Sequence, residues 1–336
     1  MTEIRGHDAA MAGFLSAMRG ARPHHGWLFS GPEGIGKATL AIAAARRLLA
    51  EAADPTLEQE GLYLSASHPT SSLMNAWSHP DFILIDRLPK DAKVCDKPRS
   101  EWGEGEELRR SIRVDQIRGL YQRFATHPTY SSRRIVILDG AEYCEVEASN
   151  ALLKLLEEPP NGTMFILVTH APGRLLPTIR SRCRMLRFSG LSDDIMTSVL
   201  RTHLPDAAPN EISVLKDLGQ GSPGKALRLA GTDVGGMTAA LKRIAAYGDP
   251  DNRERAALSQ SMSTKAGQVR FEAFLGLVPA FLAGEVKIRH GKALGAALKE
   301  WEAARDLASY AVPGSLDVQA VSFALASHVA ALAPAP

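Results

Sequence analysis

The feature that most constrains the fold is a segment in the middle of the chain where strand-like and helix-like patterns alternate. Residues 135–138 form a short apolar run that ends on Asp139, and residues 165–168 form a second run that ends on Thr169. Such runs are typical of strands buried on both faces of a sheet. A helical pattern with an apolar face lies between them and stops at Pro159. Strands that alternate with helices predict a parallel sheet, and polar residues at the strand ends are typical of its nucleotide site.

A phosphate-binding loop is predicted near the start of the chain. Apolar residues 27–29 lead into the sequence Gly-Pro-Glu-Gly-Ile-Gly-Lys, and an alanine-rich helical pattern follows at residues 38–49. This strand, loop and helix are the context that a P-loop requires, which argues against a chance match. The glycines let backbone N–H groups turn toward a phosphate, while the helix N-terminus and Lys37 add positive charge. The predicted nucleotide-binding residues of this loop are Gly31, Pro32, Glu33, Gly34, Ile35, Gly36, Lys37, Ala38 and Thr39.

Two groups that ATP hydrolysis needs are absent from their usual positions. The residue after the lysine normally supplies a hydroxyl to Mg²⁺, and here it is Ala38. Thr39 lies one helical step, about 100°, further round. Asp139 stands where a Walker B carboxylate belongs, but Gly140 follows it, and we expect Glu142 to lie too far along to reach the same point. The two losses together predict a nucleotide site without hydrolysis.

The chain resembles the AAA+ subunits of DNA clamp loaders in the segments SNALLKLLEEPP, TMFILVTH and LLPTIRSRC. The resemblance extends from Gly6 through the P-loop to residues 221–224. Within that family the chain is most similar to the delta-prime subunits of bacterial DNA polymerase III clamp loaders. Altered Walker motifs beside an intact Ser-Arg-Cys sequence at residues 181–183 favour that class over the ATP-hydrolysing gamma/tau subunits.

The resemblance implies an α/β P-loop AAA+ parallel sheet, followed by a small helical lid and an all-α collar domain. The expected boundaries are residues 1–189 for the AAA+ nucleotide-binding domain, 190–232 for the three-helix lid and 233–336 for the collar, which holds the complex together. The implied partners are the gamma/tau and delta subunits and, through the complex, the sliding clamp and primer–template DNA.

The resemblance also implies roles for particular residues. In this family the arginine of Ser-Arg-Cys enters the ATP site of a neighbouring subunit, so Arg182 is expected to act as an arginine finger in trans. Asp139, Thr169 and Lys225 are expected at this chain's own site, with ATP or ADP bound without hydrolysis. Lys225 stands where an active member has a sensor arginine, and lysine lacks the bidentate grip of a guanidinium.

Many members of this family carry four zinc-binding cysteines between the P-loop helix and the next strand. Residues 51–80 of this chain contain none. Because a structural zinc needs four well-placed ligands, we expect no zinc and an irregular insertion. His24 and His25 lack further ligands, and we expect them to point apart in a strand with a structural role. Residues 87–111 are polar and predict a surface loop.

Residues 112–126 predict a helix whose inward-facing residues are Val114, Ile117, Leu120, Tyr121 and Phe124. Five arginines precede or lie on this helix: Arg109, Arg110, Arg113, Arg118 and Arg123. They could contact DNA phosphates, since clamp loaders grip primer–template DNA. A solvated basic face is the preferred interpretation, because aromatic residues do not interleave with the arginines.

Composition limits the remaining possibilities. The net charge of the 336-residue chain is only +2, so no global field recruits nucleic acid or a membrane. Three cysteines that are far apart predict no disulfide framework. The sequence shows neither a signal peptide nor an apolar run long enough to cross a bilayer. We therefore expect a cytoplasmic protein with no membrane partner.

Two functions of different classes follow. The first is a non-hydrolysing scaffold of the clamp loader that donates Arg182 to a partner, and the second is a competent ATP-hydrolysing motor. Ala38, Gly140 and Lys225 favour the scaffold. An unrelated P-loop ATPase is disfavoured by the Ser-Arg-Cys sequence and the helical C-terminal half.

Overall fold

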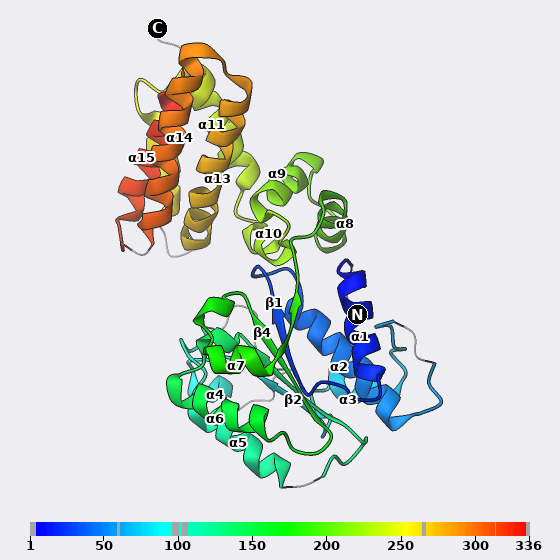
Figure 1. The fold of residues 1–336 in the computed structure, drawn as a ribbon. Helices are drawn as coiled ribbons and strands as arrows, with labels where there is room; N and C mark the ends of the chain where they lie inside the picture. The colour runs from blue at the N-terminus through cyan, green and yellow to red at the C-terminus, as the bar shows by residue number, and fades with distance from the viewer. Residues whose placement is uncertain are drawn as a thin grey trace. The chain divides into compact units, whose positions relative to one another are not determined.

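The structure is a computed structural model that describes residues 5–58, 61–95, 101–102, 107–125, 127–263, 267–312 and 314–333. The chain forms two compact units, Met1–Leu191 and Ser192–Pro336. The first contains a parallel sheet covered by helices, and the second is helical (Figure 1).

A five-stranded sheet forms the centre of the first unit, in the order β2-β3-β4-β1-β5. Its strands are β1 (Gly26–Ser30), β2 (Phe82–Ile85), β3 (Arg134–Asp139), β4 (Thr163–Thr169) and β5 (Arg184–Arg187). All neighbouring strands are parallel. The predicted parallel α/β sheet is therefore confirmed. Because β1 pairs with both β4 and β5, the segment after it lies beside the ends of both neighbours.

Helices pack on both faces of this sheet, because alternate strand residues point to opposite sides. On one face Ile135 and Ile137 share a core with α1 (Asp8–Arg19) and α2 (Lys37–Ala53). On the other face Val136 and Leu138 pack with α5, α6 and α7. These three helices are α5 (Val114–Phe124), α6 (Val146–Glu157) and α7 (Pro177–Arg182).

Several local predictions were wrong. The segment 51–80 contains a helix, α3 (Pro69–Asn75), which begins because Pro69 occupies its first turn and the His68 side chain accepts a hydrogen bond from Thr70 N. The described part of 87–111 contains α4 (Ala92–Cys95) and a bridge between Pro89 and Leu108. Residues 96–100 and 103–106 lie outside the described residues.

Two predictions about side-chain orientation were also wrong. The rings of His24 and His25 stack, with centroids 5.0 Å apart, because both residues precede β1 rather than lie in it. Tyr121 is 41% exposed, although its hydroxyl donates to the Ala151 carbonyl oxygen of α6 (3.1 Å). Ile117 and Leu120 are buried as expected, and Thr126 lies outside the described residues.

The second unit begins with α8 (Asp193–His203), α9 (Pro209–Gly219) and α10 (Pro223–Leu229), which pack on one another. It continues with α11 (Val234–Tyr247), α12 (Arg253–Met262), α13 (Gly267–Ile288), α14 (Gly291–Ala311) and α15 (Val318–Ala330). Helix α9 contacts both α11 and α13. The division of this unit into a lid and a collar at residue 232 stays a prediction. Within the described residues, no helix combines the length and the apolar character that crossing a membrane requires.

Candidate functional site

The glycine-rich loop follows β1 at the end of the sheet where β3 and β4 also end. A Cβ atom on Gly31 would lie 2.2 Å from the Phe188 carbonyl oxygen, so only glycine allows the loop to pass this close to the chain beyond β5. Gly36 has φ +93° and precedes α2, whose N-terminus faces the loop. A left-handed glycine and the N-terminus of a long helix suit a phosphate group.

The ammonium group of Lys37 is folded onto this loop. It donates hydrogen bonds to the carbonyl oxygens of Gly31 (2.8 Å) and Pro32 (2.6 Å), and the residue is buried. Burial lowers the pKa of Lys37, while the charges of Asp139, Glu142 and Glu33 oppose that shift. The site therefore combines one buried cation with carboxylates from β3 and from the turn after it.

The chain after Asp139 has no room for a larger residue than glycine. Gly140 has φ +76°, and a Cβ atom there would lie 2.7 Å from Cδ2 of Tyr143. Tyr143 belongs to the short 3₁₀ helix η2 (Ala141–Tyr143), and its ring lies under the guanidinium of Arg87 (4.0 Å to the centroid). The loss of the usual Walker B glutamate is thus built into this turn.

Glu142 lies closer to the site than we expected. Its side chain is fully buried, and Oε1 accepts a hydrogen bond from His170 N (2.8 Å) and pairs with Nδ1 of the same histidine (2.6 Å). Oε2 is buried and finds no hydrogen-bond partner among the described residues. The turn η2 carries the carboxylate back to the end of β4, which the spacing alone did not reveal. Glu142 reaches the end of β4 at His170, and its charge also acts on Lys37.

A histidine from the N-terminal segment also borders the loop. His7 has φ 63°, and its ring meets Phe188 edge-on with centroids 5.0 Å apart. Burial lowers the pKa of His7, and a hydrogen bond with the Ile35 backbone opposes the shift. Its Nε2 atom is buried without a partner within the described part of the chain. The family resemblance led us to expect the segment that contains His7 near the adenine of a bound nucleotide, although His7 itself was not among the predicted site residues.

The other predicted site residues are distributed as follows. Thr169 is buried at the end of β4, where its hydroxyl accepts a hydrogen bond from Ala171 N (3.1 Å). Ala38 is half-buried and Thr39 is exposed on the first turn of α2. Lys225 belongs to α10 of the second unit, where its backbone N–H donates to Ser222 Oγ (3.2 Å).

Arg182 lies near the start of β1, whereas the P-loop lies at the end of the same strand. A Cβ atom on Gly26, the first residue of β1, would lie 3.1 Å from the Arg182 carbonyl oxygen. The P-loop instead follows Ser30, the last residue of β1. Five strand residues span roughly 16 Å. Arg182 therefore cannot serve the phosphate loop of its own chain while the sheet is intact.

Cys183, next to Arg182, is buried. Burial raises its pKa to about 12. The thiol consequently stays protonated near neutral pH, which argues for packing and against a nucleophilic role.

Two of the basic residues around α5 have partners within the chain. Arg109 donates to the Pro89 carbonyl oxygen (3.2 Å), and Arg113 pairs with Asp115 (3.5 Å). A groove of about 360 Å³ between α5 and α6 is lined by Arg118, Tyr121, Glu147, Asn150, Ala151 and Lys154. The lining includes two basic residues and one acidic residue, and the choice between DNA contact and a solvated basic face stays a prediction.

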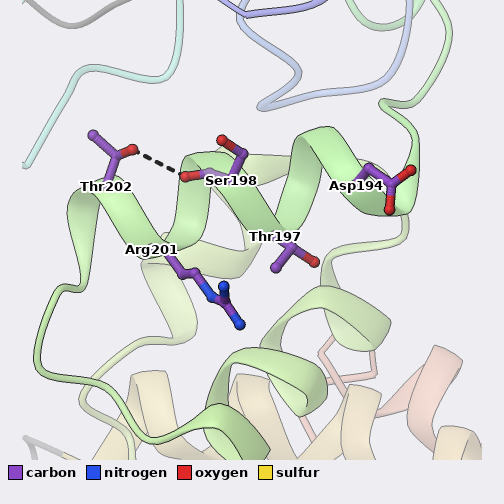
Figure 2. Close-up of a pocket in the computed structure, with 5 residues that line it drawn as sticks. All are labelled: Asp194, Thr197, Ser198, Arg201 and Thr202. Carbon is purple, nitrogen blue, oxygen red and sulfur yellow. Dashed lines mark hydrogen bonds between the residues drawn. The ribbon is translucent and has the colours of Figure 1, made fainter.

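A second hollow, of about 380 Å³, lies along α8 in the second unit. Its lining residues are Asp194, Thr197, Ser198, Arg201 and Thr202 (Figure 2). The Thr202 hydroxyl is already engaged with the Ser198 carbonyl oxygen (3.0 Å). One helix supplies the whole lining, and none of the predicted site residues contributes to it.

Within the described residues, no group of three or more His, Cys, Asp or Glu side chains is arranged to hold a metal ion. The described part of 51–80 is instead tied to α2 by Arg47. Its guanidinium donates to the carbonyl oxygens of Tyr63 (2.7 Å) and Glu58.

Comparisons with known proteins agree with this fold. Residues 6–192 match the family described as DNA polymerase III, delta subunit. The chain is 35% identical over 220 residues to the DNA polymerase III subunit delta' of Pseudomonas aeruginosa, which covers 65% of this chain and 60% of that protein. It is 29% identical over 237 residues to the Escherichia coli subunit delta', covering 70% and 63%. The chain thus spans about 60% of the length of these two relatives.

A gamma/tau subunit is also similar. The subunit of Mycobacterium tuberculosis is 33% identical over 198 residues, covering 59% of this chain and 30% of that protein. A solved gamma-subunit-related protein of Thermotoga maritima aligns over 96% of this chain and 99% of its own, with 15% identity and a TM-score of 0.43.

A parallel P-loop sheet followed by a helical unit, with the site at the strand ends, defines an α/β protein of the AAA+ class. The matched residues specify which branch of that class. The chain belongs to the DNA polymerase III delta subunit family, and its delta' relatives place it among the delta-prime clamp-loader subunits.

Proposed function

We propose that this protein is a non-hydrolysing subunit of a cytoplasmic DNA polymerase III clamp loader that lends Arg182 to the ATP site of a neighbouring subunit. In this role it works with gamma/tau and delta subunits to load the sliding clamp on primer–template DNA. The observation that carries the proposal is the position of Arg182, which lies near the start of β1 and not at the end of β1, where the P-loop of its own chain lies. A guanidinium suits this task because negative charge grows on the γ-phosphoryl oxygens during hydrolysis.

The phosphate loop of this chain has a different role in the proposal. Lys37 and the loop backbone hold ATP or ADP, but the chain lacks a hydroxyl at Ala38 and a carboxylate at Gly140. Neither zinc nor another metal is part of the proposal. Bound nucleotide then serves the stability or shape of the subunit and is not turned over.

A competent motor is the second candidate, and one observation favours it. Glu142 is a fully buried carboxylate whose charge acts on Lys37. However, one of its oxygens is held by His170. ATP hydrolysis by the purified chain separates the two candidates. The scaffold predicts no turnover above background, whereas about 1 per second or more would establish the motor.

The direct test uses the reconstituted complex with primed DNA and clamp at saturating ATP. Arg182→Ala should leave assembly intact and lower stimulated ATP hydrolysis. The loss is smaller than the roughly 10³–10⁵-fold effect of an arginine finger at one site, because the other sites keep working. Arg182→Lys should rescue poorly, since a point charge does not replace a planar fork. Arg180→Ala, an exposed arginine on the same helix, is the control. Wild-type rates from the Arg182→Ala complex would contradict the proposal.

A further inference from the structure

The guanidinium of Arg182 is bound to its own chain. Its Nη2 atom pairs with Oε1 of Glu157 (2.5 Å), and its Nη1 atom donates to the Thr178 carbonyl oxygen (3.0 Å). We propose that Glu157 is a positioning residue that holds Arg182 in a withdrawn orientation, from which the nucleotide of a neighbouring subunit must release it. This inference rests on the proposed function of Arg182 in trans.

The two contacts fix the direction of the guanidinium. Arg182 has five N–H groups, of which one on Nη1 and one on Nη2 face partners within this chain. A bidentate contact with a phosphoryl group of another subunit needs two N–H groups in a defined orientation. In the proposal, the side chain therefore turns away from the Glu157 carboxylate and the Thr178 carbonyl before it presents its fork to a neighbour.

The surroundings of the pair favour the withdrawn orientation. Glu157 is the last residue of the twelve-residue helix α6, and the C-terminus of a helix carries partial negative charge that stabilises a nearby cation. The Thr178 carbonyl oxygen adds a neutral acceptor. The charge of Arg182 is thus held where negative charge already accumulates.

The backbone of Arg182 packs closely against Gly26, so we expect release to come from the Arg182 side chain. A Cβ atom added to Gly26 would lie 3.1 Å from the Arg182 carbonyl oxygen and 3.4 Å from Sγ of the buried Cys183. It would lie 3.5 Å from Cδ2 of Leu156, the residue before Glu157. Rotation of the Arg182 side chain needs no movement of these close contacts.

The exposure of the pair sets the size of the effect. The side chains of Arg182 and Glu157 are 34% and 47% exposed. Ion pairs at such positions are weak, so removing the carboxylate should favour delivery of Arg182 by roughly threefold to fivefold. A contact of this strength disfavours the active orientation of Arg182 without preventing it.

The experiment measures ATP hydrolysis by the reconstituted complex as a function of ATP concentration, with and without primed DNA and clamp. The rate that depends on Arg182 is the difference between each complex and its Arg182→Ala counterpart. Glu157→Ala should raise this difference without DNA and clamp by roughly threefold to fivefold, through a lower KM, a higher kcat or both. Glu157→Gln should behave similarly, because it removes the charge. Glu158→Ala is the matched control and should match the wild type.

The outcomes separate this inference from the function on which it rests. A fall in the Arg182-dependent rate of Glu157→Ala would show that Glu157 supports the active orientation, and an unchanged rate would show that the pair is incidental. Either result overturns the inference while leaving the role of Arg182 intact. An effect of Glu157→Ala that persists in the Arg182→Ala background would also overturn it. If Arg182→Ala alone has the wild-type rate, the proposed function itself fails.

Discussion

The ammonium group of Lys37 lies 2.8 Å from the Gly31 carbonyl oxygen, so the lysine that should bind a phosphate is hydrogen-bonded to the backbone of its own loop. A second bond to Pro32 O (2.6 Å) strengthens this contact. The ammonium has three N–H groups, so a phosphate oxygen can accept from the third or replace one of these two carbonyl oxygens. The cost of such a replacement is limited, because a charged phosphate is a stronger acceptor than a neutral carbonyl.

The first prediction concerns this lysine. Lys37→Ala should weaken ATP binding by at least about tenfold, since a hydrogen bond to a charged group contributes roughly 1.5–3 kcal/mol. Because Ala38 offers no hydroxyl to a metal, Mg²⁺ should change the affinity of the wild type little. Isothermal titration with and without Mg²⁺ measures both effects, with the exposed Lys154→Ala as control. Unchanged heats in Lys37→Ala would count against the phosphate site.

The second prediction concerns the turn after the Walker B strand. Gly140→Ala should lower the free energy of unfolding by roughly 1–3 kcal/mol, because φ is positive and the new Cβ would meet the Tyr143 ring. Gly13→Ala is the matched control, since its Cβ enters open space within α1 and helix propensity favours alanine. Urea denaturation of both variants decides. Equal stability of Gly140→Ala and the wild type would mean that this turn is not what excludes a larger residue.

The sequence was sufficient to predict the sheet because its three central strands, β3, β4 and β1, are almost entirely buried. Apolar runs such as residues 135–138 can hardly be placed anywhere but between two layers of helices. The P-loop was recognisable because glycine spacing reports directly on backbone geometry, and Gly36 indeed has a positive φ. These features depend on local sequence, and the structure contains the parallel sheet and the positive φ of Gly36.

The contacts of the candidate site were harder to predict because they join distant residues. Glu142 meets His170, 28 residues away, only because η2 turns the chain back toward β4. Arg182 meets Glu157 only because α6 and α7 end side by side near the start of β1. No periodicity or spacing encodes such pairs. Exposed ends of helices are also the places where several partners are equally accessible to a long side chain.

The third prediction is a pH dependence of stability in the second unit. Burial alone would raise the pKa of Asp249, but hydrogen bonds from Arg255 and from Glu254 N outweigh it, so the pKa is lower than usual. The unfolded chain therefore binds a proton at higher pH than the folded one. The stabilisation is fully present above the unfolded pKa, and it is lost as pH falls through the folded pKa.

Asp249→Asn tests this arrangement. At pH 7 the variant should be less stable by roughly 1–3 kcal/mol, because charged hydrogen bonds to Arg255 are lost. The difference from wild type should shrink below about pH 4, where the aspartate of the unfolded chain becomes protonated. Asp251→Asn, an exposed neighbour, is the control. A difference that stays constant from pH 7 to 3 would show that charge at Asp249 is unimportant.

The last prediction concerns assembly through the second unit. Large apolar side chains are exposed around the end of α14, where Tyr310 and Val312 are 62% and 61% exposed and Leu316 is 38% exposed. The chain turns beside Tyr310, because Gly314 N donates to the Tyr310 carbonyl oxygen (2.8 Å). Apolar groups gathered on a surface are typical of contacts with other proteins. Under the proposed function, other clamp-loader subunits cover them.

Tyr310→Asp and Val312→Asp should therefore weaken co-elution with those subunits on size exclusion, while the thermal unfolding of the isolated chain stays unchanged. Tyr63→Asp alters a side chain that is 77% exposed in the first unit, and it should assemble like the wild type. Normal co-elution of both Tyr310→Asp and Val312→Asp would place the assembly surface elsewhere. Weak co-elution of Tyr63→Asp as well would show that added negative charge, and not the loss of this apolar surface, is responsible.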